Sequence, residues 1–209
     1  ILTHIRHSEK VFNMKRLLLI LILTFSFQSL TKANDIKDFE IEGMSIGDSL
    51  LDHLSKKEIQ NGSIYNYPSS DEFFQINFSN VNNFKTYEHF TVLIKTNDEN
   101  YIIYELSAYI DFKKNINDCY NKEKEIINDI RQVLTNIKFV NEGTIKKTID
   151  KSGKSKITIN QFYPDDGGVI KVSCHDWGDE WEKKGEIDSL SVSVASKKAF
   201  DWYINEAYK

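Results

Sequence analysis

The run YIIYELSAYIDF at residues 101–112 alternates apolar with polar or small side chains, which is the pattern of a β-strand with one buried face. Because successive side chains of a strand point to opposite faces of a sheet, every second residue shares a face. The predicted buried face consists of Ile102, Tyr104, Leu106, Ala108, Ile110 and Phe112. Glu105, Ser107 and Asp111 then lie on the opposite face.

The segment that follows changes from a period of two to a helical period. Between residues 118 and 138 the apolar side chains recur at the 3.6-residue spacing of an α-helix. They are Ile126, Ile127, Ile130, Val133, Leu134 and Ile137. Such a stripe is stable only when it is buried, so we predict that this helix packs on the sheet that contains residues 101–112.

The same two patterns extend outward from this pair of elements. Further strands are predicted at residues 38–42, 73–78, 87–95, 156–163, 169–174 and 189–195, and a first helix at residues 46–57. Ser196 begins a last helix, whose apolar stripe is Phe200, Tyr203, Ile204 and Ala207. The order is β-α-βββ-α-βββ-α. Short turns between consecutive strands favour antiparallel pairing, so we predict an α+β fold, an antiparallel sheet with amphipathic helices packed on one face.

A secretory signal peptide is predicted at residues 14–33. Lys15 and Arg16 precede an apolar run at residues 17–27 (LLLILILTFSF), and Ala33 offers a small residue at the cleavage point. The run is shorter than the about 20 residues that span a bilayer. We therefore expect cleavage after Ala33 and no stable membrane anchor afterwards; the alternative is an uncleaved anchor.

The remaining domain boundaries follow from this signal. We interpret residues 1–13 as an over-extended gene start, the alternative being a genuine N-terminal extension. Residues 34–209 are then a single domain, periplasmic or secreted in a bacterium, and long enough to bury a core of its own.

The charge balance excludes one class of partner. The chain carries 27 Lys and Arg against 31 Asp and Glu; five of the bases and one acid precede residue 34, which leaves a formal net charge of −8 for residues 34–209. An acidic domain lacks the positively charged surface that binds nucleic acid. Arg131 is the single arginine after residue 34, which also argues against phosphate ligands.

The two cysteines, Cys119 and Cys174, are predicted to form a disulfide. An even number of cysteines in an exported chain favours pairing, and both residues fall on apolar faces, one of the long helix and one of a strand. The alternative is a nucleophilic Cys174 beside His175. Neighbouring residues of a strand point to opposite faces, so His175 is poorly placed to serve as its base.

The loop at residues 176–182 (DWGDEWE) is the segment with the strongest functional signal. Two aromatic rings and several carboxylates can form a binding lip for a sugar or a cation. The residues concerned are Trp177, Trp181, Asp176, Asp179 and Glu180. The alternative is that one tryptophan closes the end of the core while the acids are solvated.

Other motifs for catalysis or cofactors are incomplete. Gly153-Lys154-Ser155 matches the end of a phosphate-binding loop, but Thr148 stands where that motif needs a glycine and a strand follows where it needs a helix. The histidines after residue 34, His53, His89 and His175, have no metal-ligand spacing. We predict no catalytic residue, no cofactor and no metal.

Three segments carry a resemblance to a known group. They are DFEIEGMSIGDSLL, YIIYELSAYIDFKKNINDCYNKEKEI, and a C-terminal run that includes GGVIKVSCHDW and DSLSVSVASKKAFDWYINEA. The chain resembles small exported proteins of AT-rich marine alphaproteobacteria, a group with no known activity, so the resemblance implies a compartment and no function. Residues 43–48 (GMSIGD) are also similar to the helix entry of outer-membrane assembly lipoproteins of the BamE type, although the lipobox cysteine is missing.

Two hypotheses about function remain. The first is a non-catalytic binding or envelope-accessory domain of the periplasm, whose partner is an envelope protein or a glycan. The second is a periplasmic hydrolase that uses carboxylates of the 176–182 loop as acid and base. Convergent carboxylates in a deep pocket favour the hydrolase, and an aromatic patch favours the binding domain.

Overall fold

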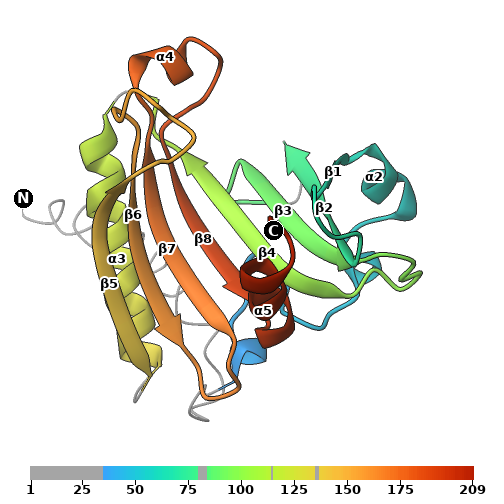
Figure 1. Ribbon diagram of the computed structural model, residues 1–209. Coiled ribbons are helices and arrows are strands. Elements are labelled where there is room, and N and C mark those ends of the chain that lie inside the picture. The colour runs from blue at the N-terminus through green and yellow to red at the C-terminus, as the bar shows by residue number, and fades with distance from the viewer. Residues whose placement is uncertain (1–34, 80–83, 114, 135–136) are drawn as a thin grey trace, which may run out of the picture. The chain divides into compact units, whose positions relative to one another are not determined.

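The computed structural model describes residues 35–79, 84–113, 115–134 and 137–209 (Figure 1). The predicted gene extension at residues 1–13 and the predicted signal peptide at residues 14–33 lie outside the described residues. The chain divides into two units, Ile1–Lys32 and Ala33–Lys209, and all described residues belong to the second. Within the described ranges, no helix is both long and apolar enough to cross a membrane.

The described part is built on one eight-stranded antiparallel sheet with the strand order β1-β2-β3-β4-β8-β7-β6-β5. The strands are β1 (Ser63–Asn66), β2 (Phe73–Ser79), β3 (His89–Lys95), β4 (Ile103–Asp111), β5 (Lys138–Lys146), β6 (Lys156–Tyr163), β7 (Val169–Asp176) and β8 (Ser189–Ala195). The helices are α2 (Lys56–Asn61), α3 (Ile116–Val133), α4 (Asp179–Glu182) and α5 (Lys197–Asn205), with short 3₁₀ turns η1 (Ile36–Asp38) and η2 (Leu50–Asp52). The predicted α+β class with an antiparallel sheet is confirmed.

The sheet has two different faces, and a helix covers part of each. On one face, called the α3 face, Leu106 of β4 lies opposite Val194 of β8, which lies opposite Ile170 of β7. These residues belong to the main core, which also contains Ile127 and Ile130 of α3. The predicted packing of this helix on the sheet is therefore confirmed.

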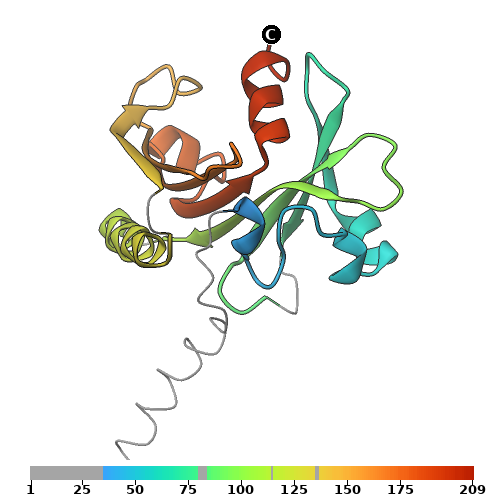
Figure 2. The ribbon, with the colours of Figure 1, turned by 90° about the horizontal axis from the view of Figure 1, so that it is seen from below.

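The other face, called the α5 face, carries the last helix. Val169 and Ala195 pair across β7 and β8 and form a second core with Trp202 of α5. Figure 2 shows α3 and α5 on opposite sides of the sheet. The prediction that all helices pack on one face is thus wrong in this detail, because Val169 and Ala195 form an apolar patch on the α5 face, and α5 packs on that patch.

The predicted stripe of the last helix is also displaced. The buried residues of α5 are Ala199 and Trp202. Of the predicted stripe, Phe200 and Tyr203 are partly buried against the second core, Ala207 is buried beyond the end of the helix, and Ile204 is 57% exposed. The indole of Trp202 fills the space over the sheet, and this orients the helix so that Ile204 turns to solvent.

The N-terminal elements differ from the prediction. Residues 38–42 are not a strand, because the chain reverses at Glu42 and Gly43, both with positive φ, and Ile41 forms an isolated bridge with Met44. Residues 46–57 are not one helix. The backbone N–H groups of Gly47 and Leu50 donate to carbonyls of residues 103 and 101, and these tertiary hydrogen bonds replace helical ones.

Helix α2 therefore begins later than predicted. It starts at Lys56 behind a capping box, in which Ser55 and Glu58 each bind the other's backbone N–H. Its buried residue is Ile59, which joins the main core. The apolar residues of the predicted helix, such as Leu50 and Leu54, are still buried in that core, so periodicity identified the buried side chains without identifying the backbone that carries them.

The two edge strands were not predicted. The residues of β1 are all exposed, and those of β5 are mostly exposed. The predicted helix extended to residue 138, but α3 ends at Val133 and β5 begins at Lys138. Edge strands bury few side chains, so they lack the apolar alternation by which strands are recognised in a sequence.

A β-bulge alters the predicted face of β4. The register between β3 and β4 shifts so that Ile94 pairs with Ile103 while Leu93 pairs with Glu105. Ile103 is consequently buried on the α3 face, and Tyr104 joins the core under α5. The predicted burial of Leu106, Ala108 and Ile110 against the main core is confirmed, and that of Tyr104 is wrong.

The packing of α3 on the sheet leads to a stability prediction. Ile130→Ala should lower the free energy of unfolding by about 2–5 kcal/mol, because the side chain is 5% exposed and its removal leaves a cavity. Val133→Ala on the same helix is the matched control, since Val133 is 39% exposed and its truncation should change stability little. Urea denaturation measures both variants, and equal losses would contradict the packing.

Candidate functional site

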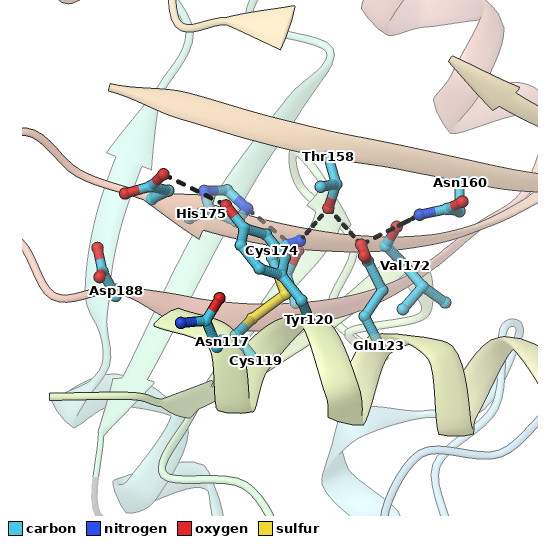
Figure 3. Close-up of a disulfide and its surroundings, with 12 residues drawn as sticks. Asn117, Cys119, Tyr120, Glu123, Thr158, Asn160, Val172, Cys174, His175 and Asp188 are labelled. Atoms are coloured by element: carbon cyan, nitrogen blue, oxygen red, sulfur yellow. Dashed lines mark hydrogen bonds between the residues drawn. A yellow bond between two sulfur atoms is a disulfide. The ribbon is translucent and has the colours of Figure 1, made fainter. Parts of the chain in front are cut away.

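The predicted disulfide between Cys119 and Cys174 is present (Figure 3). Its Cα atoms are 6.0 Å apart, and both residues are fully buried between α3 and β7. The bond joins the first turns of α3 to the strand that leads into the 176–182 loop. Cys174 is therefore not a free nucleophile, and its neighbour His175 has a different role.

A buried carboxylate lies beside the disulfide. Glu123 of α3 is 6% exposed, and its Oε1 accepts hydrogen bonds from the hydroxyl of Thr158 and from Asn160 Nδ2, the latter at 3.1 Å. Thr158 Oγ1 in turn accepts from the backbone N–H of Cys174 at 2.7 Å. Burial raises the pKa of Glu123 above its ordinary value, although the hydrogen bonds oppose the shift. Figure 3 shows this network bridging α3 to β6 and β7.

The tryptophans of the predicted binding lip stack on one another and on lysines. The rings of Trp177 and Trp181 are 5.5 Å apart between centroids, at an interplanar angle of 30°. Lys147 Nζ lies 3.1 Å from the centroid of Trp177, and Lys184 Nζ lies 4.3 Å from that of Trp181. Both indoles are half-buried, and each already carries an aromatic and a cationic contact.

The carboxylates of the predicted lip face different partners. Asp176 Oδ2 accepts a hydrogen bond from the hydroxyl of Tyr120 on α3. Asp179 lies 3.9 Å from Lys154 of the β5–β6 turn, with 77% of its side chain exposed. Glu180 is exposed in the first turn of α4. Among the described residues, no single side chain contacts all three of these carboxylates.

The loop is instead held against the turn between β5 and β6. The backbone N–H of Gly178 donates to Ser155 Oγ at 3.0 Å, and Ser155 donates to the carboxylate of Asp150. A Cβ at Gly178 would lie 2.8 Å from the Cβ of Lys154, so the two segments are in close contact. Hydrogen bonds from this turn keep the pKa of Asp150 well below its usual range.

Lys147 and His175 form a polar chain with Ser191. Lys147 Nζ is 2.9 Å from His175 Nδ1, and His175 Nε2 is 3.1 Å from Ser191 Oγ. Burial lowers the pKa of His175 to about 3 and that of Lys147 to about 8, so at neutral pH the imidazole is neutral while the lysine is cationic. Sequence reasoning did not single out Lys147, which has no motif around it.

The tautomer of His175 follows from its two neighbours. The ammonium of Lys147 has only protons to offer, so Nδ1 accepts and the imidazole proton resides on Nε2, which donates to Ser191. A serine nucleophile needs the opposite arrangement, with an unprotonated nitrogen facing its hydroxyl. This contact therefore orients side chains at the end of the sheet and does not activate Ser191.

The α5 face continues beyond the helix as a hydrogen-bonded layer of polar side chains, in which the serines are buried. Ser107 donates to Glu105 Oε1 at 3.1 Å and lies 2.8 Å from Ser193 Oγ. The pairing registers place further polar side chains on the same face: Gln75, Thr91, Tyr109, Lys171, Ser173 and Ser191. Among these side chains, Gln75, Thr91, Glu105, Tyr109 and Lys171 are half-buried, whereas the serines are buried.

A cluster of tyrosines borders this polar surface. The ring of Tyr67 lies 4.9 Å from Tyr65, 5.6 Å from Tyr203 and 5.4 Å from Tyr208, in edge-to-face geometry. It also lies 4.7 Å from Trp202. Tyr65 is 42% and Tyr208 62% exposed. We call Tyr65, Tyr67, Tyr203 and Tyr208 the tyrosine cluster.

The hydroxyls of the tyrosine cluster point into the polar network. Tyr67 Oη is 2.8 Å from Tyr203 Oη and donates to Gln75 Oε1 at 3.0 Å. Burial raises the pKa of Tyr203, and the nearby carboxylate of Glu105 raises it further. Tyr65 lies in β1, Tyr67 in the segment after it, Tyr203 in α5 and Tyr208 beyond the end of α5. No sequence motif connects these segments.

Comparison with known proteins finds no family model, no curated protein and no solved structure that matches this chain.

The disulfide leads to a prediction on stability. It closes a separation of 55 residues, so replacing both cysteines by alanine should lower the free energy of unfolding by about 4 kcal/mol in the chain-entropy model. Urea denaturation of the double variant measures the loss, and the reduced wild type should behave alike. Two titratable thiols in the native protein would show that the bond does not form.

Glu123 leads to a prediction on pH. The pKa of Glu123 is raised above 4.5 in the folded state. Between pH 4.5 and this raised pKa, the folded protein therefore binds more protons than the unfolded chain. The free energy of unfolding therefore falls as the pH rises through that window. Glu123→Gln keeps an oxygen acceptor for Asn160 and does not titrate.

The variant's stability relative to wild type should consequently increase as the pH rises above 4.5 and then level off. Urea denaturation at a series of pH values measures the difference, with Glu125→Gln, an exposed site on the same helix, as the control. A difference independent of pH would contradict the raised pKa.

Proposed function

We propose that residues 34–209 form a non-catalytic binding or envelope-accessory domain of the bacterial periplasm, and that it binds a glycan on the α5 face. The observation that carries this proposal is the tyrosine cluster beside a row of hydrogen-bonding side chains. Tyr65 and Tyr208 expose aromatic surface, and the half-buried Gln75 and Glu105 lie on the adjoining face.

The chemistry of this surface suits a ligand with both apolar and hydroxyl-bearing faces. Tyrosine supplies a rigid ring at low entropic cost together with a polar tip. Ring faces can contact the C–H face of a sugar, while carboxylate, amide and hydroxyl groups accept or donate hydrogen bonds to its hydroxyls. A glycan is the ligand class that offers both.

The proposed compartment rests on two observations. The pattern at residues 14–33 is that of a secretory signal peptide, and the disulfide between Cys119 and Cys174 suits an oxidising compartment. Glycans are abundant in the bacterial envelope, so compartment and ligand class agree.

Two observations favour binding over hydrolysis. Asp176 binds Tyr120, whereas Asp179 and Glu180 are exposed to solvent and are not enclosed in a pocket. His175 donates toward Ser191 and so does not serve as its base.

The proposal is tested with two oligosaccharides, the tetramer of N-acetylglucosamine and the tetramer of glucosamine. Isothermal titration calorimetry should detect binding of at least one of them. Tyr65→Ala and Tyr208→Ala should each weaken that binding by about tenfold, as expected for loss of an aromatic contact.

Ile149→Ala is the matched control, because Ile149 is 61% exposed in the β5–β6 turn and belongs to neither core. It should leave the affinity unchanged. Absence of binding to both tetramers, or unchanged affinity in both tyrosine variants, would overturn the proposal.

A further inference from the structure

Glu105 is a carboxylate without a cation on the α5 face. It is half-buried on β4, between the tyrosine cluster and the serines of β4 and β8. Ser107 donates to it, and its charge raises the pKa of Tyr67, Tyr203 and Tyr208. Among the described residues it takes part in no ion pair.

The lysines of the same region do not neutralise it. Lys198 of α5 lies 2.8 Å from Glu72, and Lys95 of β3 lies 4.0 Å from the same carboxylate. Lys171 shares the α5 face, but it lies on β7, two strands away from β4. It makes no ion pair with Glu105.

The surroundings of Glu105 match the chemistry of an ammonium group. A cation is attracted to the faces of tyrosine rings and to a carboxylate, and the attraction grows when water is excluded. The tyrosine hydroxyls add acceptors for N–H donors. A neutral sugar would leave the carboxylate's charge uncompensated on binding, whereas an amino sugar would compensate it.

We propose that the glycan carries a protonated amino group that binds Glu105, so that the ligand is an amino sugar with a free amine. This inference rests on the proposed function and narrows its ligand class. Glu105 is then the residue that selects charged over neutral sugars, and the tyrosine cluster supplies contact area to both.

The two tetramers of the preceding experiment separate the inference from the proposed function. The glucosamine tetramer is cationic, and the N-acetylglucosamine tetramer has the same sugar backbone without charge. The wild-type protein should bind the cationic tetramer at least about tenfold more tightly, as expected for a hydrogen bond between charged groups. Glu105→Gln should abolish this preference, because glutamine keeps an oxygen that accepts from the hydroxyls of both tetramers but has no charge to bind the amine.

Glu142→Gln is the matched control, because it removes the same charge from an exposed position on the edge strand β5. It should retain the preference, which excludes an effect of net charge alone. A pH series on the wild-type protein needs no variant: the preference should disappear as the pH rises through the pKa of the sugar's amine.

Each outcome decides one of the two claims. Equal affinity for the two tetramers, a preference for the neutral one, or a preference that survives Glu105→Gln or the rise in pH overturns the amino-sugar inference. The proposed function still stands in those cases if Tyr65→Ala weakens binding. Absence of binding to both tetramers overturns both.

Discussion

The antiparallel register of β4, β8 and β7 is the constraint on which the rest of the structure depends. It places Leu106, Val194 and Ile170 on one face and Glu105, Ala195 and Val169 on the other. Because side chains alternate with a period of two, a slip of one residue would exchange the two faces. The apolar side would then meet α5 and the serines would meet α3. The register therefore decides both the core and the surface available to a ligand.

Covalent and polar contacts reinforce this arrangement at the end of the sheet that carries the 176–182 loop. The disulfide joins the start of α3 to β7, and Glu123 binds Thr158 in the layer between them. Beyond the disulfide, the loop rests on the β5–β6 turn through Gly178 and Lys147. Residues 176–182, which carry the strongest functional signal in the sequence, therefore hold their own loop against the β5–β6 turn.

The surface with the better functional chemistry lies toward the middle and the opposite end of the α5 face. There the serines of β4 and β8 are buried, while Glu105 and Gln75 are half-buried beside the exposed rings of Tyr65 and Tyr208. Exposed aromatic rings next to polar side chains form the kind of surface that binds an amphipathic ligand in water.

Much of the fold was predictable because the burial of side chains produces a periodic pattern of apolar residues in the local sequence. The alternation in residues 105–111, the burial of Ile127 and Ile130 on α3 and the pairing of Cys119 with Cys174 are confirmed. The first two depend on which side chains avoid water, and the third also on the presence of two cysteines in the chain. Prediction was wrong where backbone hydrogen bonds come from distant residues, as at Gly47 and Leu50, or where little is buried, as in β1 and β5. The bulge at Tyr104 is likewise a property of the pairing between two strands.

The candidate site was predictable only in part. The sequence singled out Trp177 and Trp181, whose composition is conspicuous, but not Lys147, Glu105 or the tyrosine cluster. The sequence by itself determined the fold class and the main buried side chains, because these follow from the local period of hydrophobicity. It also determined the cysteine pairing, because the chain has two cysteines and both fall on apolar faces. Only the tertiary structure decided that Tyr65, Glu105 and Tyr208 share one surface. Such proximity between residues far apart in the chain is set by strand order and helix placement, which no local period encodes.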